Sequence, residues 1–123
     1  MRVLEIGCGP GVAARAILER IGHGHVLAID PSAKAIAQAK ASSGSELATG
    51  YLEFRQIAIE DFRLNNDEKP YDIAFAVRVG ALDGRHPDAG RIALANIKQA
   101  LVKDGRLFID GGAPLKEVTL DVA

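Results

Sequence analysis

The residues with the clearest capacity for chemistry lie near the start of the chain, where three glycines follow an apolar run. Gly7, Gly9 and Gly11 come directly after the β-prone residues 3–6. Glycine adopts backbone conformations closed to other residues, and it leaves bare main chain against which a ligand can lie. The helix predicted over residues 12–21 begins at this loop, and its free N–H groups favour an anionic group. The pattern indicates a site for a nucleotide-type cofactor.

Two carboxylates lie close to the ends of neighbouring predicted strands. Glu5 lies two residues before Gly7 in a buried strand, where a carboxylate is costly unless it is hydrogen-bonded or faces a cation. Asp30 ends the apolar stretch of residues 25–30, and its side chain can accept hydrogen bonds from both hydroxyls of a ribose. A cofactor with cationic groups and a ribose would satisfy both carboxylates.

The elements that position these residues alternate between strand-like and helix-like patterns. This alternation predicts one α/β domain over residues 1–123, a Rossmann-like doubly wound fold with helices on both faces of a mainly parallel five-stranded sheet of order 3-2-1-4-5. The ligand is expected beyond the carboxyl ends of the strands, between strands one and four. We expect strands at residues 3–6, 25–30, 52–58, 71–79 and 106–110, helices at 12–21, 33–41 and 89–102, polar loops at 42–45, 60–70 and 80–88, and a turn at 104–105.

Composition restricts the partners. The chain has 123 residues, 48% of them hydrophobic, so one core is expected. Its 15 basic and 16 acidic residues are interspersed, which provides no electrostatic footprint for a nucleic acid or a membrane and favours a small-molecule partner. Cys8 has no second cysteine to pair with, and no export segment is recognisable, so the cytoplasm is the expected location.

Two cofactor classes compete for the glycine loop. A dinucleotide fingerprint needs glycine at its first, third and sixth positions, and here the sixth position is Val12. The spacing therefore disfavours NAD, which stays as a less favoured alternative. S-adenosylmethionine would bring a sulfonium and an ammonium group toward Glu5, whereas NAD would bring two phosphates.

The loop and the next strand end resemble a known family. Val-Leu-Glu-Ile-Gly-Cys-Gly-Pro-Gly at residues 3–11, followed by Leu-Ala-Ile-Asp-Pro-Ser at residues 27–32, looks like the class I S-adenosylmethionine-dependent methyltransferases. Residues 71–75 and 101–107 are similar to the family's fourth strand and its later helix-turn-strand. The resemblance implies that the loop holds the methionine part, Asp30 the ribose, and the residues after strand three the adenine. The family's frequent Gly-Asp-Ala is Ile-Ala-Ile at residues 57–59, so an acidic side chain is missing there unless Glu60 or Asp61 replaces it.

The resemblance implies methyl transfer from S-adenosylmethionine to a small-molecule acceptor. No catalytic residue is identified, because the sulfonium is already an activated electrophile and the protein has mainly to align the reactants. No metal site is predicted, since the three histidines lack ligand spacing; of these, His86 follows strand four on the side expected for substrate, with Arg78 and Arg85. The expected cofactor-binding residues are Glu5, Gly7, Cys8, Gly9, Gly11, Asp30, Pro31, Ile59, Glu60 and Val77.

The ends of the chain depart from the family pattern. Members generally carry a helical segment before the first strand and an antiparallel pair of strands after the fifth, and neither is expected within these residues. An uncovered edge at strand five would follow, and with it self-association through that edge. The alternative function is a binding module or truncated core with little or no turnover.

Overall fold

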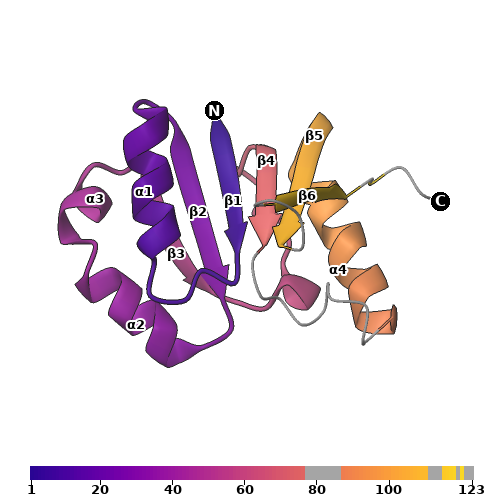
Figure 1. The fold of residues 1–123 in the computed structure, drawn as a ribbon, viewed down its shortest axis with the longest axis horizontal. Helices are drawn as coiled ribbons and strands as arrows, with labels where there is room; N and C mark the ends of the chain where they lie inside the picture. Colours follow the sequence, from indigo (N-terminus) through magenta and orange to yellow (C-terminus); the bar gives the residue numbers. More distant parts are fainter. Residues whose placement is uncertain (77–86, 111–114, 119, 121–123) are drawn as a thin grey trace.

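The computed structural model describes residues 1–76, 87–110, 115–118 and 120. A single sheet of six strands has the order β3-β2-β1-β4-β5-β6, as Figure 1 shows. The first five strands run parallel and β6 pairs antiparallel with β5. The strands are β1 (Arg2–Ile6), β2 (His25–Asp30), β3 (Leu52–Gln56), β4 (Tyr71–Ala76), β5 (Leu101–Asp110) and β6 (Leu115–Val118); the helices are α1 (Val12–Ile21), α2 (Ala33–Ala41), α3 (Gly44–Ala48), the 3-10 turn η1 (Ile59–Asp61) and α4 (Pro87–Ala100).

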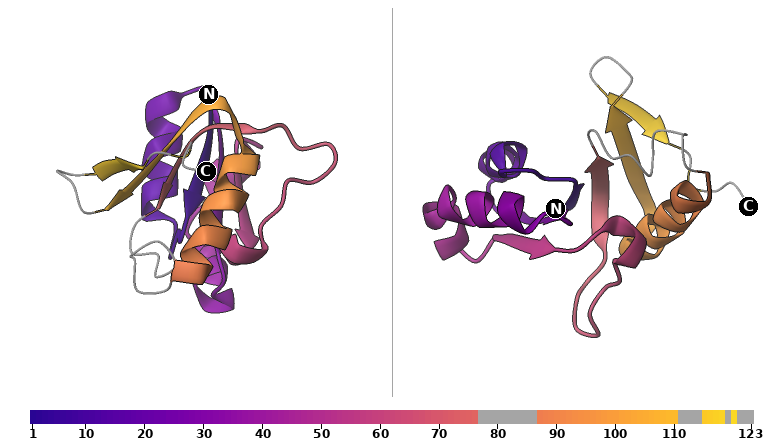
Figure 2. Two further views of the ribbon diagram at one scale, coloured as in Figure 1. Left: turned by 90° about the vertical axis from the view of Figure 1, so that its right-hand side faces the viewer. Right: turned by 90° about the horizontal axis from the view of Figure 1, so that it is seen from below.

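The central strand β1 contributes side chains to two cores, because successive residues of a strand point to opposite faces. Val3 packs with residues of α1 and α2, whereas Leu4 and Ile6 pack with residues of α4 and η1. Figure 2 shows the two groups of helices on either side of the sheet. Coverage of both faces explains why the predicted strands are continuously apolar at their centres.

The α/β class and the parallel order of the first five strands are confirmed. Helices α1 and α2 have the predicted bounds. The side chain of Ser32 caps α2 by accepting a hydrogen bond from the backbone N–H of Ala35 at 3.1 Å. Gly22 follows α1 with a φ of 69°, a conformation that favours glycine at the end of a helix.

The predicted number of strands and the predicted sheet edge are wrong. The sequence after Pro114 predicts a short tail that is helical or frayed, but this stretch contains β6, whose Val118 pairs with Leu107 of β5. Val118 is partly buried against the core that contains Leu107, so its packing favours the added strand. Because β5 is hydrogen-bonded on both sides, it does not form the open edge on which the expected self-association depended.

Two local predictions between strands also need correction. Residues 42–45, expected as a polar break, lead into α3, and Ser43 is fully buried where Arg15 Nη1 donates to its Oγ at 2.9 Å. The helical spacing of residues 89–102 predicts an inner face that includes Ile92. In the structure α4 buries Ala93, Asn96, Ile97 and Ala100, while Ile92 is half exposed. The small alanines let the helix lie close to the sheet.

The transition from α4 to β5 differs from the expected turn. Strand β5 begins at Leu101, opposite Tyr71, and the pairing then shifts register so that Arg106 lies opposite Ile73. The turn predicted at residues 104–105 is therefore an irregularity within the strand. A bulge of this kind accommodates extra residues without ending the ladder.

Candidate functional site

The glycine loop links the ends of β1 and β2. The backbone N–H groups of Gly7 and Cys8 both donate to the carbonyl of Ile29, at 2.8 and 3.0 Å. Gly7, Gly9 and Gly11 have φ angles of 77°, 53° and 87°, a region that side chains disfavour. The loop therefore depends on glycine for its shape, as the sequence predicts.

Gly9 and Gly11 also differ from each other in what an added side chain would meet. A Cβ at Gly11 would lie 2.9 Å from Cζ of Phe54, so this glycine makes room for the packing of α1 on β3. A Cβ at Gly9 would meet no atom within 4 Å. Among the described residues, the space over Gly9 is open, as a ligand lying against bare main chain requires.

Asp30 lies beside this loop. Its Oδ2 accepts a hydrogen bond from the N–H of Gly9 at 3.0 Å, and its Oδ1 accepts one from the N–H of Ser32 at 2.8 Å. A carboxylate offers about four acceptor positions, so two remain for ligand hydroxyls. The structure thus brings Asp30 and the glycine loop together, and the two hydrogen bonds fix the direction of the carboxylate.

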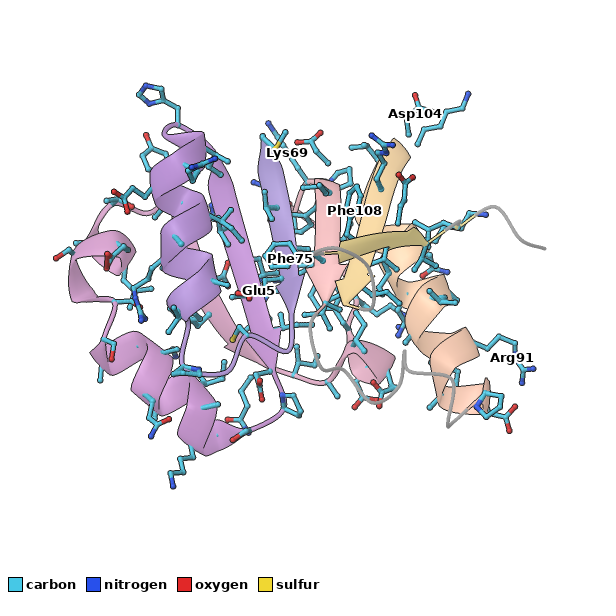
Figure 3. All side chains as sticks on the ribbon, in the orientation of Figure 1. Glu5, Lys69, Phe75, Arg91, Asp104 and Phe108 are labelled. Carbon is cyan, nitrogen blue, oxygen red and sulfur yellow. The ribbon has the colours of Figure 1, made fainter. Side chains whose placement is uncertain are left out.

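Glu5 is the most unusual side chain of the site. It is 5% exposed, and its Oε1 is buried with no hydrogen-bond partner among the described residues. Its neighbours across the sheet on the same face are Ala28 and Phe75, as Figure 3 illustrates for Phe75. Burial, with a further contribution from the charge of Asp30, raises the pKa of Glu5 to about 7. A ligand cation would stabilise the ionised form and complete the site.

Cys8 is packed rather than presented for reaction. Its side chain is 6% exposed in the core beneath α1, and burial, together with the charges of Glu5 and Asp30, raises its pKa to about 12. The nucleophilic form of cysteine is the thiolate, which this environment disfavours. Any contact of Cys8 with a ligand would therefore come from its main chain.

The residues at the end of β3 lie beside Asp30 and Pro31 and form a further side of the candidate site. The N–H of Ile57 donates to the carbonyl of Asp30 at 3.1 Å, and Gln56 Nε2 lies 3.5 Å from the carbonyl of Pro31. Ile59 and Glu60 follow in η1, with Ile59 buried and Glu60 half-buried. The segment expected to contact the base therefore begins beside the residue expected to contact the ribose.

One residue on this side of the site was missed by the sequence analysis. Asn96 of α4 is 4% exposed, and its Nδ2 donates to the carbonyls of both Ile59 and Glu60. The sequence spacing could have indicated that Asn96 is buried, because a residue three positions after Ala93 and four before Ala100 lies on the same face of the helix. An asparagine on a buried face needs partners, and these partners lie in the segment expected to contact the base.

Several predicted groups cannot be placed. Val77 lies outside the described residues, as do Arg78, Arg85 and His86. Within the described part of the chain, no group of three or more His, Cys, Asp or Glu side chains could hold a metal ion. No helix in those same segments is long and apolar enough to cross a bilayer.

The proteins with similar sequences or folds include the following three. Trans-aconitate 2-methyltransferase of Streptomyces avermitilis is 35% identical over 72 residues, which is 58% of this chain and 26% of that protein. An O-methyltransferase from a trans-AT PKS multienzyme of Brevibacillus brevis, solved with S-adenosyl-L-homocysteine, superposes with a TM-score of 0.74 at 16% identity over 89% of this chain and 34% of that one. The [4+2]-cyclase SpnF gives a TM-score of 0.68 at 23% identity over 88% of this chain and 37% of that one.

These likenesses differ in what they establish. At such low identity the two solved structures show the fold alone, and their different reactions confirm that the fold does not determine the chemistry. The chain spans about a quarter of the length of the curated relative and just over a third of the two solved chains. The family model described as a methyltransferase domain matches residues 3–105. The chain therefore belongs to the methyltransferase-domain family, whose cofactor is S-adenosylmethionine.

Proposed function

We propose that this chain binds S-adenosylmethionine at the glycine loop and serves methyl transfer to a small-molecule acceptor. The observation that carries the proposal is Glu5, a buried carboxylate with an unpartnered oxygen at the base of the loop. Such a group needs a cation, and the cofactor offers an ammonium and a sulfonium. A dinucleotide would instead bring phosphates near Glu5 and Asp30, which would repel them.

The rest of the loop suits the methionine part of the cofactor. No side chain caps the N-terminus of α1, whose N-cap is Gly11, and its first turn contains no acidic residue. The N–H groups of that turn can therefore receive the methionine carboxylate, while Glu5 faces the ammonium. Gly7, Cys8 and Gly9 supply the surrounding main chain.

The nucleoside part is assigned to the ends of β2, β3 and β4. Asp30 has acceptor positions left for the ribose hydroxyls, and Pro31 borders them. Ile59 and Glu60 in η1 contact the adenine, and Val77, which follows β4 in the sequence, stays a predicted cofactor-binding residue. The arrangement of β2, β3 and η1 around one strand edge supports these roles.

The chemistry requires little from the protein beyond placement. When bound, S-adenosylmethionine supplies a methyl group on a cationic sulfur, open to attack by a nucleophilic acceptor. The residues of this chain orient the cofactor and exclude water on its sheet side. Alignment of two reactants can lower a barrier by about 7–11 kcal/mol, so a dedicated acid or base is unnecessary.

The second candidate function is cofactor binding with little or no turnover. It is favoured by the coverage of the relatives, since the chain corresponds to 26% of the trans-aconitate 2-methyltransferase and 34% of the Brevibacillus brevis chain. Residues that complete an acceptor site in those proteins need not lie in the matched portion. Cofactor binding is common to both candidates and turnover separates them.

Titration calorimetry with S-adenosylhomocysteine, S-adenosylmethionine and NAD tests the cofactor assignment. We expect binding of the first two and none of NAD; the reverse preference would contradict the proposal. A methyl-transfer assay follows, with small carboxylic acids in the acceptor panel because one relative is a trans-aconitate 2-methyltransferase. Turnover with any acceptor supports the enzyme, and cofactor binding without turnover across the panel supports the binding module.

A further inference from the structure

Asn96 connects α4 to the segment assigned to the adenine. It is 4% exposed, and its Nδ2 donates to the carbonyl of Ile59 at 2.9 Å and to that of Glu60 at 2.8 Å. Both N–H bonds of the amide are therefore used on two consecutive backbone groups. A buried amide whose two N–H bonds are both used on one turn of backbone restricts the orientation of that turn more than apolar packing does.

These hydrogen bonds set the orientation of the peptide between Ile59 and Glu60. In a trans peptide the carbonyl and the following N–H point in opposite directions. Because the carbonyl of Ile59 points toward α4, the N–H of Glu60 points away from α4. Two backbone hydrogen bonds hold the turn: the N–H of Asp61 donates to the carbonyl of Ala58 at 3.0 Å, and the N–H of Phe62 donates to the carbonyl of Ile59 at 3.2 Å.

The outward N–H of Glu60 is free to meet a ligand, because no hydrogen bond within the described residues uses it. The same turn carries the carboxylates of Glu60 and Asp61, which are hydrogen-bond acceptors. The N–H of Glu60 can donate to a ring nitrogen of a base, and a neighbouring carboxylate can accept from an amino group on the same edge of that base. Adenine has that edge, whereas hypoxanthine has a ring N–H and a carbonyl in the same places.

We propose that Asn96 is a positioning residue that sets the base specificity of the site by holding the Ile59–Glu60 peptide with its N–H outward. The inference rests on the proposed function, since it concerns the nucleoside end of the same cofactor site. Without Asn96, the carbonyl of Glu60 loses its buried donor and the carbonyl of Ile59 keeps only the N–H of Phe62, so the peptide is held less tightly and can rotate. A rotated peptide presents a carbonyl where adenine needs an N–H, and specificity of this kind depends on unpaired polar groups in the wrong complex.

The test compares two ligands that differ only in the base, S-adenosylhomocysteine and S-inosylhomocysteine. Calorimetry gives the ratio of their dissociation constants for the unsubstituted chain, for Asn96→Leu and for Ile97→Val. Leucine has the same branching and the same number of side-chain heavy atoms as asparagine, and it has no donor. Ile97 is fully buried on the same helix and has no hydrogen-bonding side chain, so its substitution controls for lost stability.

We expect the unsubstituted chain to prefer the adenosyl ligand and Asn96→Leu to reduce that preference about tenfold. Ile97→Val should lower the melting temperature and leave the ratio unchanged. An unchanged ratio in folded Asn96→Leu overturns the inference while the proposed function stands. If the unsubstituted chain binds neither ligand, the proposed function fails instead. Should Asn96→Leu not fold, Asn96→Ser, which keeps one donor, decides by the same ratio: a reduced preference supports the inference and an unchanged one overturns it.

Discussion

Replacing Glu5 by glutamine tests whether the ionised, buried carboxylate destabilises the folded protein in the absence of a cationic ligand. Glutamine keeps the size and polarity of the side chain and removes its titration. Burial, and secondarily the charge of Asp30, raises the pKa of Glu5 from its ordinary value of 4.5 to about 7. The unfolded chain therefore loses this proton near pH 4.5 and the folded chain near pH 7. Between those values the folded state binds more protons, so the contribution of Glu5 to stability falls as the pH rises.

The expected magnitude follows from the size of the pKa change. At about 1.4 kcal/mol per pKa unit, a rise from 4.5 to about 7 corresponds to about 3 kcal/mol. The free energy of unfolding of Glu5→Gln, relative to that of the unsubstituted chain, should therefore increase by about this amount between pH 4 and pH 8. Most of the change should lie between pH 4.5 and pH 7.

Urea denaturation at a series of pH values measures this difference, and the other titrating groups cancel because both chains contain them. A difference in unfolding free energy that does not change with pH would refute the argument that Glu5 is buried without a partner. The matched control is Glu19→Gln, which makes the same chemical change on the exposed side of α1. The ligand supplies a second check: S-adenosylhomocysteine should bind Glu5→Gln more weakly, because glutamine offers its ammonium no charge.

Three further predictions concern the loop and the sheet. Asp30→Ala should weaken binding of S-adenosylmethionine by about 2–4 kcal/mol in calorimetry, since it loses charge-assisted hydrogen bonds to the ribose; equal affinity in the folded variant would exclude the ribose role. Gly9→Ala should weaken cofactor binding and cost about 1–2 kcal/mol of stability for its φ of 53°, because its Cβ meets no protein atom, whereas Gly11→Ala should lower the melting temperature further through the added contact with Phe54. Equal losses of stability in the two variants would contradict this distinction. In amide hydrogen exchange, β6 should exchange first and β1 last, because β6 is the outermost antiparallel strand and β1 lies at the centre of the sheet; protection of β6 equal to that of β1 in a monomer would contradict the order.

Most of the fold could be predicted because its signals are local. The apolar centre of residues 25–30 and the spacing of residues 12–21 each determine an element whatever the rest of the chain does. Strand β6 has four residues and depends on pairing with β5, with Val118 beside Leu107. A segment this short has little intrinsic preference, so its structure is set by a partner that the sequence pattern does not reveal. The exposure of Ile92 on α4 has the same origin, since the small residues Ala93 and Ala100 determine which side of the helix approaches the sheet.

In the candidate site, too, the features that depend on local sequence could be predicted and those that depend on distant contacts could not. The glycine positions and the strand-end location of Asp30 follow from the order of residues, because a parallel sheet brings the carboxyl ends of its strands to one edge. The contact of Asn96 with Ile59, 37 residues earlier, depends on where α4 crosses η1 and could not be obtained from spacing alone. The environment of Glu5 could be predicted only in part. Its burial was predictable from the strand, but the missing partner of Oε1 emerges only when every neighbouring polar group is placed. The sequence can therefore show that a buried carboxylate needs a partner, whereas the structure is needed to show that the described part of the protein does not provide one, and this difference is what points to a cationic ligand.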